Sequence, residues 1–291
     1  MRGNETVDEG TLRSEMAGLD ALEQAPSHDT TRVSAVWQSS WPKLAALALA
    51  LGLWQLIVES GWKKRYVLPG PNEVLPRLWH ELGRSTTWDA IGTTLRRGVV
   101  GFSMAMVVGL ALGLAVSRWR LLRTAVGSLI SGLQTMPSIA WFPLALVLFS
   151  QSERAIYFVV IIGAAPSIAN GLITGIDHIP PLLLRAGRVL GATGFARYRH
   201  IVIPAATPTF IAGVKQGWAF CWRSLMAGEL LVIIANKPSI GARLQYERDF
   251  ADYPGMMAWM LIILVIGITI DTLCFTAIDR RIRARRGLGI E

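Results

Sequence analysis

The sequence predicts an all-α integral membrane protein with six transmembrane helices. Of its 291 residues, 52% are hydrophobic, whereas an ordinary soluble domain has roughly 45–50% even when glycine is counted. Three windows, 98–117, 125–151 and 155–176, contain no charged residue. Each has about the 20 residues that an α-helix needs to cross a bilayer. Long uncharged windows in a chain of this composition indicate membrane-spanning helices.

The N-terminal part combines a polar segment with the first predicted span. Residues 1–40 are polar and mixed in charge, and they lack the basic start and early apolar core of a secretory signal. We therefore expect a flexible cytoplasmic tail. The first span is predicted at 44–58 and is extended by Trp41 and Trp62, because tryptophan rings favour the membrane interface.

A surface helix and a second span are expected next. Residues 72–82 carry apolar side chains at helical spacing after a cluster of proline and glycine, which predicts an amphipathic helix lying on the membrane. The second span is predicted at 94–117. Gly109 and Gly113 share one face of this helix, so another helix can approach it closely.

Proline residues mark the third and fourth predicted spans. The third, at 124–149, contains Pro137 and Pro143, and the fourth, at 155–176, contains Pro166. Proline inside a helix removes a backbone hydrogen bond and bends the segment. A break at membrane depth is tolerated only where it is buried in protein or lines a cavity.

The fifth and sixth spans complete a predicted transmembrane domain at 41–279. The fifth span, at 208–234, is the least apolar, and the sixth covers 253–278. The polar residues of the fifth span are Lys215, Gln216, Arg223 and Glu229. Six crossings place both termini on one side of the membrane.

The distribution of arginine predicts the orientation. Arginine residues cluster after the second, fourth and sixth spans and in the basic tail 280–291. These segments lie on one side in a six-span arrangement, which the positive-inside rule makes cytoplasmic. Lys63, Lys64 and Arg65 lie on the other side and disagree with this orientation. We expect a multi-pass protein of the bacterial inner (cytoplasmic) membrane with both termini in the cytoplasm.

Several function classes are not expected. The net charge is +9, but the basic residues gather at the ends of apolar segments, so no nucleic-acid binding is predicted. Cys221 and Cys274 lie inside predicted spans and suit packing, and no metal-ligand spacing links the four histidines. No Gly-x-x-x-x-Gly-Lys-Ser/Thr phosphate loop occurs. The chain is therefore predicted to be no enzyme and to bind no metal and no cofactor of its own.

A short basic segment, 185–204, separates the fourth and fifth spans. Its charges would be unpaired in hydrocarbon, so it must project into water, where it can meet a partner. Gly191 and then Pro204 are expected to close it. The alternative is a solvated basic loop whose positive charges only fix the orientation of the chain in the membrane.

Segment 185–204 resembles the cytoplasmic loop of binding-protein-dependent ABC importer permeases. The pattern of that loop is Glu-Ala-Ala, three residues, Gly and, further on, an Ile-x-Leu-Pro-like end. Ala186, Gly191 and the run Ile-Val-Ile-Pro at 201–204 fit it. Arg185 replaces the glutamate, and Gly187 replaces the second alanine.

The resemblance extends from about residue 54 to the end of the sixth span. Four motifs are similar to the branch of this family that imports nitrate, taurine, aliphatic sulfonates and related compounds. They are LPGP at 68–71, MPSIAWFPL at 136–144, WR at 222–223 and GE at 228–229.

The resemblance implies a type I importer permease that pairs with a second permease copy as a homodimer in membrane lipid. It implies two partner ATPase subunits, which would hold ATP and Mg, and an extracytoplasmic substrate-binding protein. Segment 185–204 would form a coupling helix docked in a groove of the ATPase. The residues expected at this contact are Arg185, Ala186, Gly187, Gly191, Ala192, Phe195, Tyr198 and Pro204.

Polar residues near the break and in the fifth span are candidates for a translocation path. Burying the charge of Arg223 inside a span costs free energy unless the side chain faces water or a partner. Arg223 is therefore either a cationic station for an anionic substrate or half of an ion pair, most simply with Glu229. The break in the third span either lines the path or only shapes packing. The candidate residues are Gln134, Met136, Pro137, Ser138, Trp141, Gln216, Trp222, Arg223 and Glu229.

The sequence therefore predicts the permease subunit of an ATP-driven, binding-protein-dependent importer of a small anion, with aliphatic sulfonate preferred over nitrate or taurine. The same architecture carrying a non-anionic solute, such as a pyrimidine precursor, is an alternative. A secondary transporter is a further alternative, but neither coupling charges near the midplane nor an internal repeat is evident in the sequence.

Overall fold

The computed structural model describes residues 32–278, and its contacts divide the chain into two compact units, 1–62 and 63–291. The described part of the first unit is a single helix, α2 (Arg32–Glu59), which begins inside the segment predicted as a tail. Its part Trp41–Glu59 is long and apolar enough to cross a membrane. Residues 1–31 and the predicted basic tail 280–291 lie outside the described residues.

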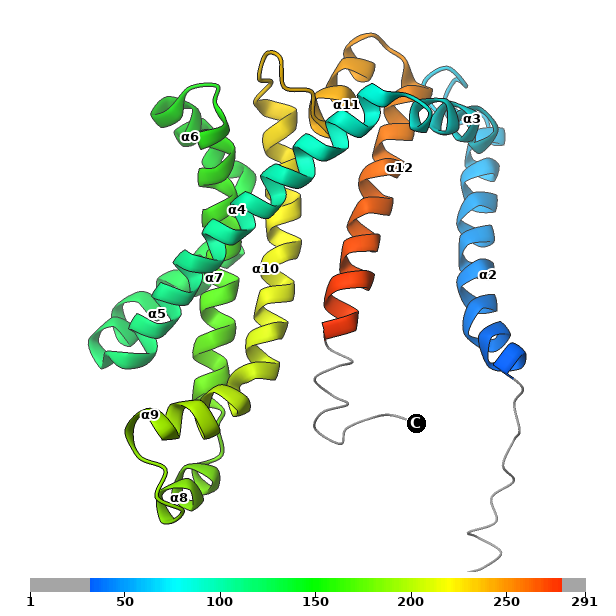
Figure 1. Ribbon diagram of the computed structural model, residues 1–291. Coiled ribbons are helices and arrows are strands. Elements are labelled where there is room, and N and C mark those ends of the chain that lie inside the picture. The colour runs from blue at the N-terminus through cyan, green and yellow to red at the C-terminus, as the bar shows by residue number, and fades with distance from the viewer. Residues whose placement is uncertain (1–31, 279–291) are drawn as a thin grey trace, which may run out of the picture. The chain divides into compact units, whose positions relative to one another are not determined.

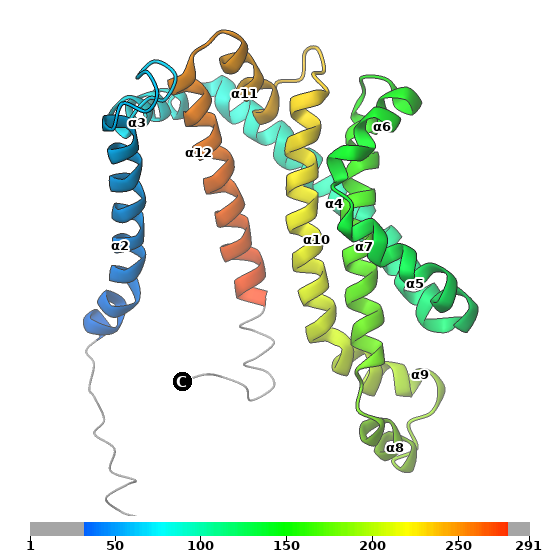
Figure 2. The ribbon, with the colours of Figure 1, turned by 180° about the vertical axis from the view of Figure 1, so that it is seen from behind.

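The core of the second unit is made by three long helices. They are α4 (Ser85–Arg118), α7 (Glu153–Asp177) and α10 (Ile203–Leu231). α7 and α10 run side by side and α4 crosses them, as Figures 1 and 2 show from opposite sides. Over half of the apolar window of α7 is buried, which makes this helix the centre of the unit.

Small residues let the three core helices touch backbone to backbone. A Cβ added to Gly171 of α7 would lie 2.6 Å from the Cα of Gly213 in α10. A Cβ on Gly109 of α4 would lie 2.8 Å from the carbonyl oxygen of Ala165. Association by small residues is typical of membrane helices, because lipid provides little hydrophobic drive between apolar surfaces.

The third predicted span is broken, as its prolines indicate. α5 (Arg120–Thr135) and the helical pair η1 (Ser138–Trp141) and α6 (Phe142–Phe149) meet at an angle of 104°. Met136 is extended, as expected because the ring of Pro137 disfavours helical backbone at the residue before it. Pro143 causes no break, since it lies in the first turn of α6, where no intrahelical N–H is needed.

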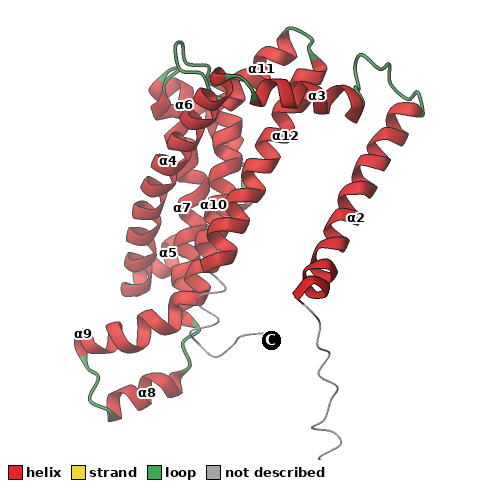
Figure 3. Cartoon of the chain, turned by 45° about the vertical axis from the view of Figure 1, so that its right-hand side comes forward, coloured by secondary structure: helices red, strands yellow, loops and turns green. Residues whose placement is uncertain are grey.

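The segment between α7 and α10 forms one end of the second unit, as Figures 1 and 3 show. It contains α8 (Pro181–Val189), α9 (Gly194–Arg197) and a π-helical turn, η2 (Tyr198–Val202), which continues into α10. The expectation that Pro204 closes this segment is wrong. Pro204 lies in the first turn of α10, where proline is tolerated, so the helix runs through it.

The opposite end of the unit carries α3 (Pro71–Leu82) and α11 (Ile240–Asp249). α3 confirms the predicted amphipathic helix at 72–82. α12 (Tyr253–Ile270), followed by a π-helical turn η3 (Asp271–Thr276), packs on both. Near the end of α12, Asp271 pairs with Lys215 of α10 at 3.1 Å.

Ion pairs connect α3 to the end of α11 and to the turn between α11 and α12. Arg77 Nη2 lies 2.8 Å from Asp252 Oδ2 and 3.7 Å from Glu247 Oε2, and Arg77 Nη1 lies 3.3 Å from Glu81 Oε1. Burial and the neighbouring carboxylate of Asp252 raise the pKa of Glu247. This carboxyl group therefore takes up a proton more readily than a solvated glutamate does.

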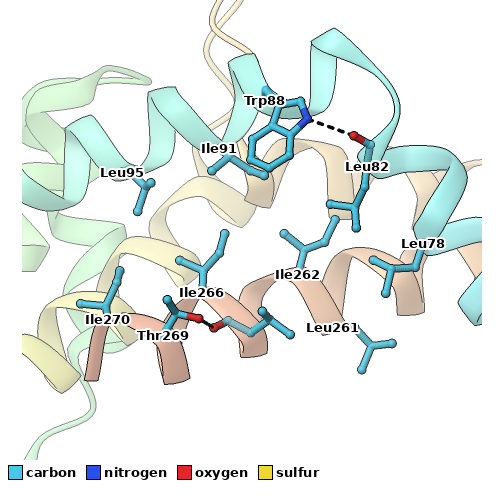
Figure 4. Close-up of a pocket in the computed structure, with 11 residues that line it drawn as sticks. Leu78, Leu82, Trp88, Ile91, Leu95, Leu261, Ile262, Ile266, Thr269 and Ile270 are labelled. Atoms are coloured by element: carbon cyan, nitrogen blue, oxygen red, sulfur yellow. Dashed lines mark hydrogen bonds between the residues drawn. The ribbon is translucent and has the colours of Figure 1, made fainter. Parts of the chain in front are cut away.

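An apolar groove of about 340 Å³ lies between α12 and the helices α3 and α4. Leu82 and Leu78 of α3, Ile91 of α4 and Ile262 of α12 are among its walls (Figure 4). Trp88 covers part of it and donates its Nε1–H to the carbonyl oxygen of Leu82 at 3.0 Å.

Four described helices are long and apolar enough to span a membrane, or five if the bent pair is one span. They contain all the predicted spans except the fifth. α10 is long enough to cross, but its polar residues keep its hydropathy below that of the others. The fold is all-α over residues 32–278, and the total of six crossings stays a prediction.

Candidate functional site

A cavity of about 380 Å³ lies at the break between α5 and η1. Residues 133–139 of the break line it together with Gly163 of α7 and with Phe220, Arg223 and Ala227 of α10. The cavity therefore joins the broken span to both central helices.

Close packing holds η1 at the edge of this cavity. Ser224 Oγ of α10 donates to Ser138 Oγ at 2.7 Å. A Cβ on Gly163 would lie 2.6 Å from Ser224 Oγ, so a larger residue here would displace the hydroxyl that makes this contact. The break is thus positioned by side-chain bonds as well as by Pro137.

Arg223 of α10 is a cationic residue in the lining of the cavity. Its Nε donates to the carbonyl oxygen of Ala219 at 3.1 Å, and its Cζ lies 4.8 Å from the ring centroid of Phe220. Within residues 32–278 no carboxylate pairs with Arg223. The alternative ion pair with Glu229 is not formed, because Glu229 is fully buried with other partners.

Two further donors near the break have no acceptor in the described part of the chain. Gln134 Nε2, in a residue that lines the cavity, and Trp141 Nε1, in η1, are both buried without a hydrogen-bond partner there. Buried donors are normally satisfied. A guanidinium group and an unsatisfied amide next to one hollow suit an oxyanion, which offers several acceptors and a negative charge.

A buried ion pair lies toward the α3 and α11 end of the core helices. Arg97 of α4 is 1% exposed and Glu229 of α10 is 0% exposed. Arg97 Nη1 lies 3.0 Å from Glu229 Oε1, and Arg97 Nε lies 3.1 Å from Glu153 Oε1 at the start of α7. One arginine therefore bridges the other two core helices.

The carboxylate of Glu229 also fixes the start of α11. Its Oε2 accepts from Thr94 Oγ1 at 2.8 Å and from the backbone N–H of Gly241 at 3.2 Å. The backbone N–H of Ile240 in turn donates to Thr94 Oγ1 at 3.0 Å. Glu229 thus closes the loop that reverses the chain from α10 to α11.

The structure brings together only part of the predicted path. Gln134, Met136, Pro137, Ser138 and Arg223 line one cavity, and Trp141 lies in the adjoining turn. Three other candidates lie elsewhere. Gln216 is exposed on α10. Trp222 packs toward α12, its Nε1 3.2 Å from where a Cβ on Gly267 would be, and Glu229 belongs to the buried charge cluster.

The sequence analysis missed Arg97 and Thr94. Both fall inside the predicted second span, and they lie one helical turn apart on a single face. A charged residue inside a membrane span needs a partner of opposite charge. The position of Arg97 in the second span therefore could have predicted a buried acidic residue on another helix.

The predicted coupling segment begins inside α8, a helix with a defined C-terminal turn. After α8, Gly191 adopts φ +79°. The backbone N–H of Ala192 donates to the carbonyl oxygen of Gly187 at 2.9 Å, and that of Gly191 donates to Arg188 at 3.1 Å. This pair of bonds around a left-handed glycine is the Schellman motif. Gly191 therefore turns the chain as predicted.

The departure from the family pattern at Gly187 has a structural reason. A Cβ on Gly187 would overlap Ile201 Cδ1, so the family's alanine would require the end of the Ile201 side chain to move away from α8. Arg185, Ala186 and Gly187 lie in α8, Phe195 in α9 and Tyr198 in η2.

Large apolar side chains of this segment are exposed. The exposed fractions are 87% for Val189, 85% for Leu190 and 76% for Phe195. A groove of about 590 Å³ lies beside them between α8 and η2, with Ala186, Gly187, Ala192 and Pro204 in its wall. Contiguous exposed apolar groups of this kind indicate a surface that a partner covers.

The family model described as the binding-protein-dependent transport system inner membrane component matches residues 105–284. The chain belongs to this family. The matched range includes the cavity and all of segment 185–204. The protein is thus the membrane permease component of an ABC importer and not an enzyme; the ATPase of such a system is a separate subunit.

Named relatives cover most of this permease. A putative ABC transporter permease protein of Methanocaldococcus jannaschii is 29% identical over 233 residues, which are 79% of this chain and 86% of the relative. A putative aliphatic sulfonates transport permease protein of Escherichia coli is 29% identical over 75% of this chain and 81% of its own length. A nitrate import permease protein of Synechocystis is 29% identical over 64% and 70%.

A solved structure has a similar fold. The methionine ABC transporter MetNI, in an inward-facing conformation, contains a chain with a TM-score of 0.51 and 23% identity to this permease. The match covers 67% of this chain and 93% of that chain. The permease therefore has the fold of a type I ABC importer permease.

Proposed function

We propose that this permease translocates a small oxyanion, with an aliphatic sulfonate preferred over nitrate or taurine, and that the cavity at the α5–η1 break is a station on its path. The observation that carries the proposal is Arg223, which lines the cavity and has no carboxylate partner in the described part of the chain. A relative that is named for aliphatic sulfonates and another named for nitrate support an anionic solute.

The free-energy cost of placing an arginine in lipid supports a position for Arg223 that faces water or another protein surface. Placing an arginine at the centre of a membrane helix costs about 2.5–3.5 kcal/mol on insertion scales. Gln216 lies on the same exposed side of α10. A second copy of the chain, facing this side of α10, would complete the path and form the expected homodimer.

Coupling to ATP hydrolysis is assigned to segment 185–204. Its exposed apolar side chains and flanking arginines would dock on the ATPase subunits, which hold ATP and Mg. The arginines of this end also favour a cytoplasmic position for it and for both chain termini. The cavity and α11 would then lie at increasing distance from the ATPase.

Transport in proteoliposomes containing the permease, its ATPase and its binding protein tests the role of Arg223. We expect Arg223→Gln to reduce uptake of an alkanesulfonate at least tenfold and Arg223→Lys to retain part of it, because lysine keeps the charge but not the planar fork. Arg154→Gln, which changes an exposed arginine outside the cavity, is the matched control.

The outcome is interpretable only for assembled complexes, so each variant is first checked for co-purification with the ATPase. Full sulfonate uptake by Arg223→Gln would contradict the anion station. Uptake of a neutral solute that is insensitive to this substitution would favour the non-anionic alternative.

A further inference from the structure

The turn between α11 and α12 has a strained backbone. Ala251, in the middle of this turn, adopts φ +57° although it is not a glycine. A left-handed conformation is unfavourable for any residue that carries a Cβ. The backbone N–H of Asp252 donates to the carbonyl oxygen of Glu247 at 2.9 Å, which closes the turn. Contacts around the turn therefore have to offset the strain at Ala251.

Side chains from both ends of the turn and from α3 meet at this point. Asp252 Oδ1 accepts from the backbone N–H of Gly255 at 3.0 Å, and Asp252 Oδ2 accepts from Arg77 Nη2 at 2.8 Å. Glu247 Oε2 lies 3.7 Å from the same nitrogen of Arg77, which is too far for a hydrogen bond. A Cβ on Gly255 would lie 2.8 Å from Glu247 Oε2 and 3.0 Å from Asp252 Oδ2. The two carboxyl groups therefore converge on one side of the turn.

Three carboxylates share two arginines at this junction. The charged groups that face Glu247 are Arg77 and Glu81 of α3 and Asp252 of the turn. Arg77 is shared by all three acids, and Arg84 Nη1 lies 3.0 Å from Glu81 Oε1. When Glu247 is ionised, its carboxylate and that of Asp252 repel each other across the turn.

Burial makes the protonation state of Glu247 matter. Its side chain is 16% exposed, and charges that are partly buried are screened less than charges in water. Burial and the charge of Asp252 raise the pKa of Glu247, so this group keeps its proton at a pH at which a solvated glutamate has lost it. The protonated carboxyl can donate a hydrogen bond to Asp252. A proton thus converts the repulsion across the turn into an attraction.

We propose that this junction is a proton-controlled clamp, in which protonated Glu247 holds α3 and the turn together and ionised Glu247 loosens them. An acid whose pKa is raised in the closed clamp stabilises it fully below the ordinary pKa, and this stabilisation is lost as the pH rises through the raised value. The clamp is therefore firm in acid and looser at higher pH, where the strain at Ala251 can relax. It would act whichever solute the permease carries.

Hydrogen exchange in the full transporter, permease with ATPase, in lipid nanodiscs tests the clamp. The readout is the protection factor of the backbone amides of α3 and of residues 250–256, which removes the intrinsic pH dependence of exchange. We expect this factor to fall at least threefold from about pH 5 to about pH 8. Glu247→Gln, which resembles the protonated form, should keep it constant. An unchanged factor in the unaltered transporter, or an unchanged pH response in Glu247→Gln, would overturn the proposal.

Two substitutions nearby serve as controls. Asp249→Asn changes an acid of the same helix that is 52% exposed and pairs with Arg248 outside the clamp, so the pH response should remain. His80 Nδ1 lies 4.0 Å from Glu81 Oε1, and histidine changes its charge between about pH 5 and about pH 8. His80→Gln should keep the response as well. Loss of the response in either control, or an equal fall of protection in α8, would overturn the assignment to Glu247.

Ala251→Gly tests the strained turn without changing a charge. Glycine adopts a positive φ without a steric penalty, so the amides of residues 250–256 should be at least twofold better protected at about pH 8. The pH response should become smaller, because less strain is released when Glu247 ionises. Unchanged protection at this pH would contradict the role of Ala251 in the clamp.

Discussion

The carboxylate of Glu229 binds three groups from two other elements. Its removal should therefore destabilise the packing of α4, α10 and α11 together. In Glu229→Ala, Arg97 would remain buried with only Glu153 as a counter-charge. Breaking a buried ion pair by removing one partner costs about 3–5 kcal/mol. We expect a loss of this size in the free energy of unfolding in detergent, and a smaller one for Glu229→Gln, which keeps an acceptor for Thr94.

Glu73→Ala is the surface control for this measurement. Glu73 lies 4.0 Å from Arg65, and both side chains are largely exposed, so the substitution should change stability very little. Equal losses for Glu73→Ala and Glu229→Ala would show that the buried cluster contributes no special stability.

Among the elements, α8 depends on its C-terminal turn. Gly191 has open space around it but a φ of +79°, so Gly191→Ala adds backbone strain without a clash. A left-handed conformation costs a non-glycine residue about 1–2 kcal/mol. This cost lowers the equilibrium population of the turn by a factor of roughly 5–30. We expect substrate-stimulated ATP hydrolysis to fall several-fold while the permease still inserts and assembles.

Gly127→Ala in α5 is the matched control for Gly191→Ala. A Cβ there also meets nothing within 4 Å, but Gly127 lies inside a helix and lacks a positive φ. Its activity should be unchanged. Normal coupling in Gly191→Ala would show that the Schellman turn does not position the docking surface.

For the whole molecule, the proposed homodimer is expected to use the exposed polar side of α10 as the contact between its two copies. In a chain with Cys274→Ser, the remaining Cys221 is buried and unreactive toward a partner. We expect Gln216→Cys in this background to form a disulfide-linked dimer on oxidation in the membrane. Val107→Cys, on an exposed apolar side of α4, should stay monomeric because lipid would cover that side. Cross-linking of both, or of neither, contradicts this arrangement.

The sequence predicted the helices better than their contacts. Uncharged windows and Pro137 identified the spans and the break, because burial in lipid acts on composition along the chain. The Arg97–Glu229 pair joins residues 132 apart, whereas closeness in the sequence suggested Arg223 as the partner of Glu229. The prediction for Pro204 was wrong because proline ends a helix from its interior but is tolerated in its first turn. The π-helical turn η2 leads directly into α10 at Ile203, which places Pro204 in that first turn.

The backbone contact between Gly171 and Gly213 gives α10 the geometry of a lever. No side chain separates the two helices there, so we take this backbone contact as the pivot of the lever. At a rise of 1.5 Å per residue, Ile203 lies about 15 Å from the pivot on one arm and Glu229 about 24 Å on the other. A tilt about this point moves the two ends in opposite directions, and the Glu229 end travels farther. If α10 tilts as a rigid rod about this contact, a small displacement at η2 becomes a larger one at the buried charge cluster.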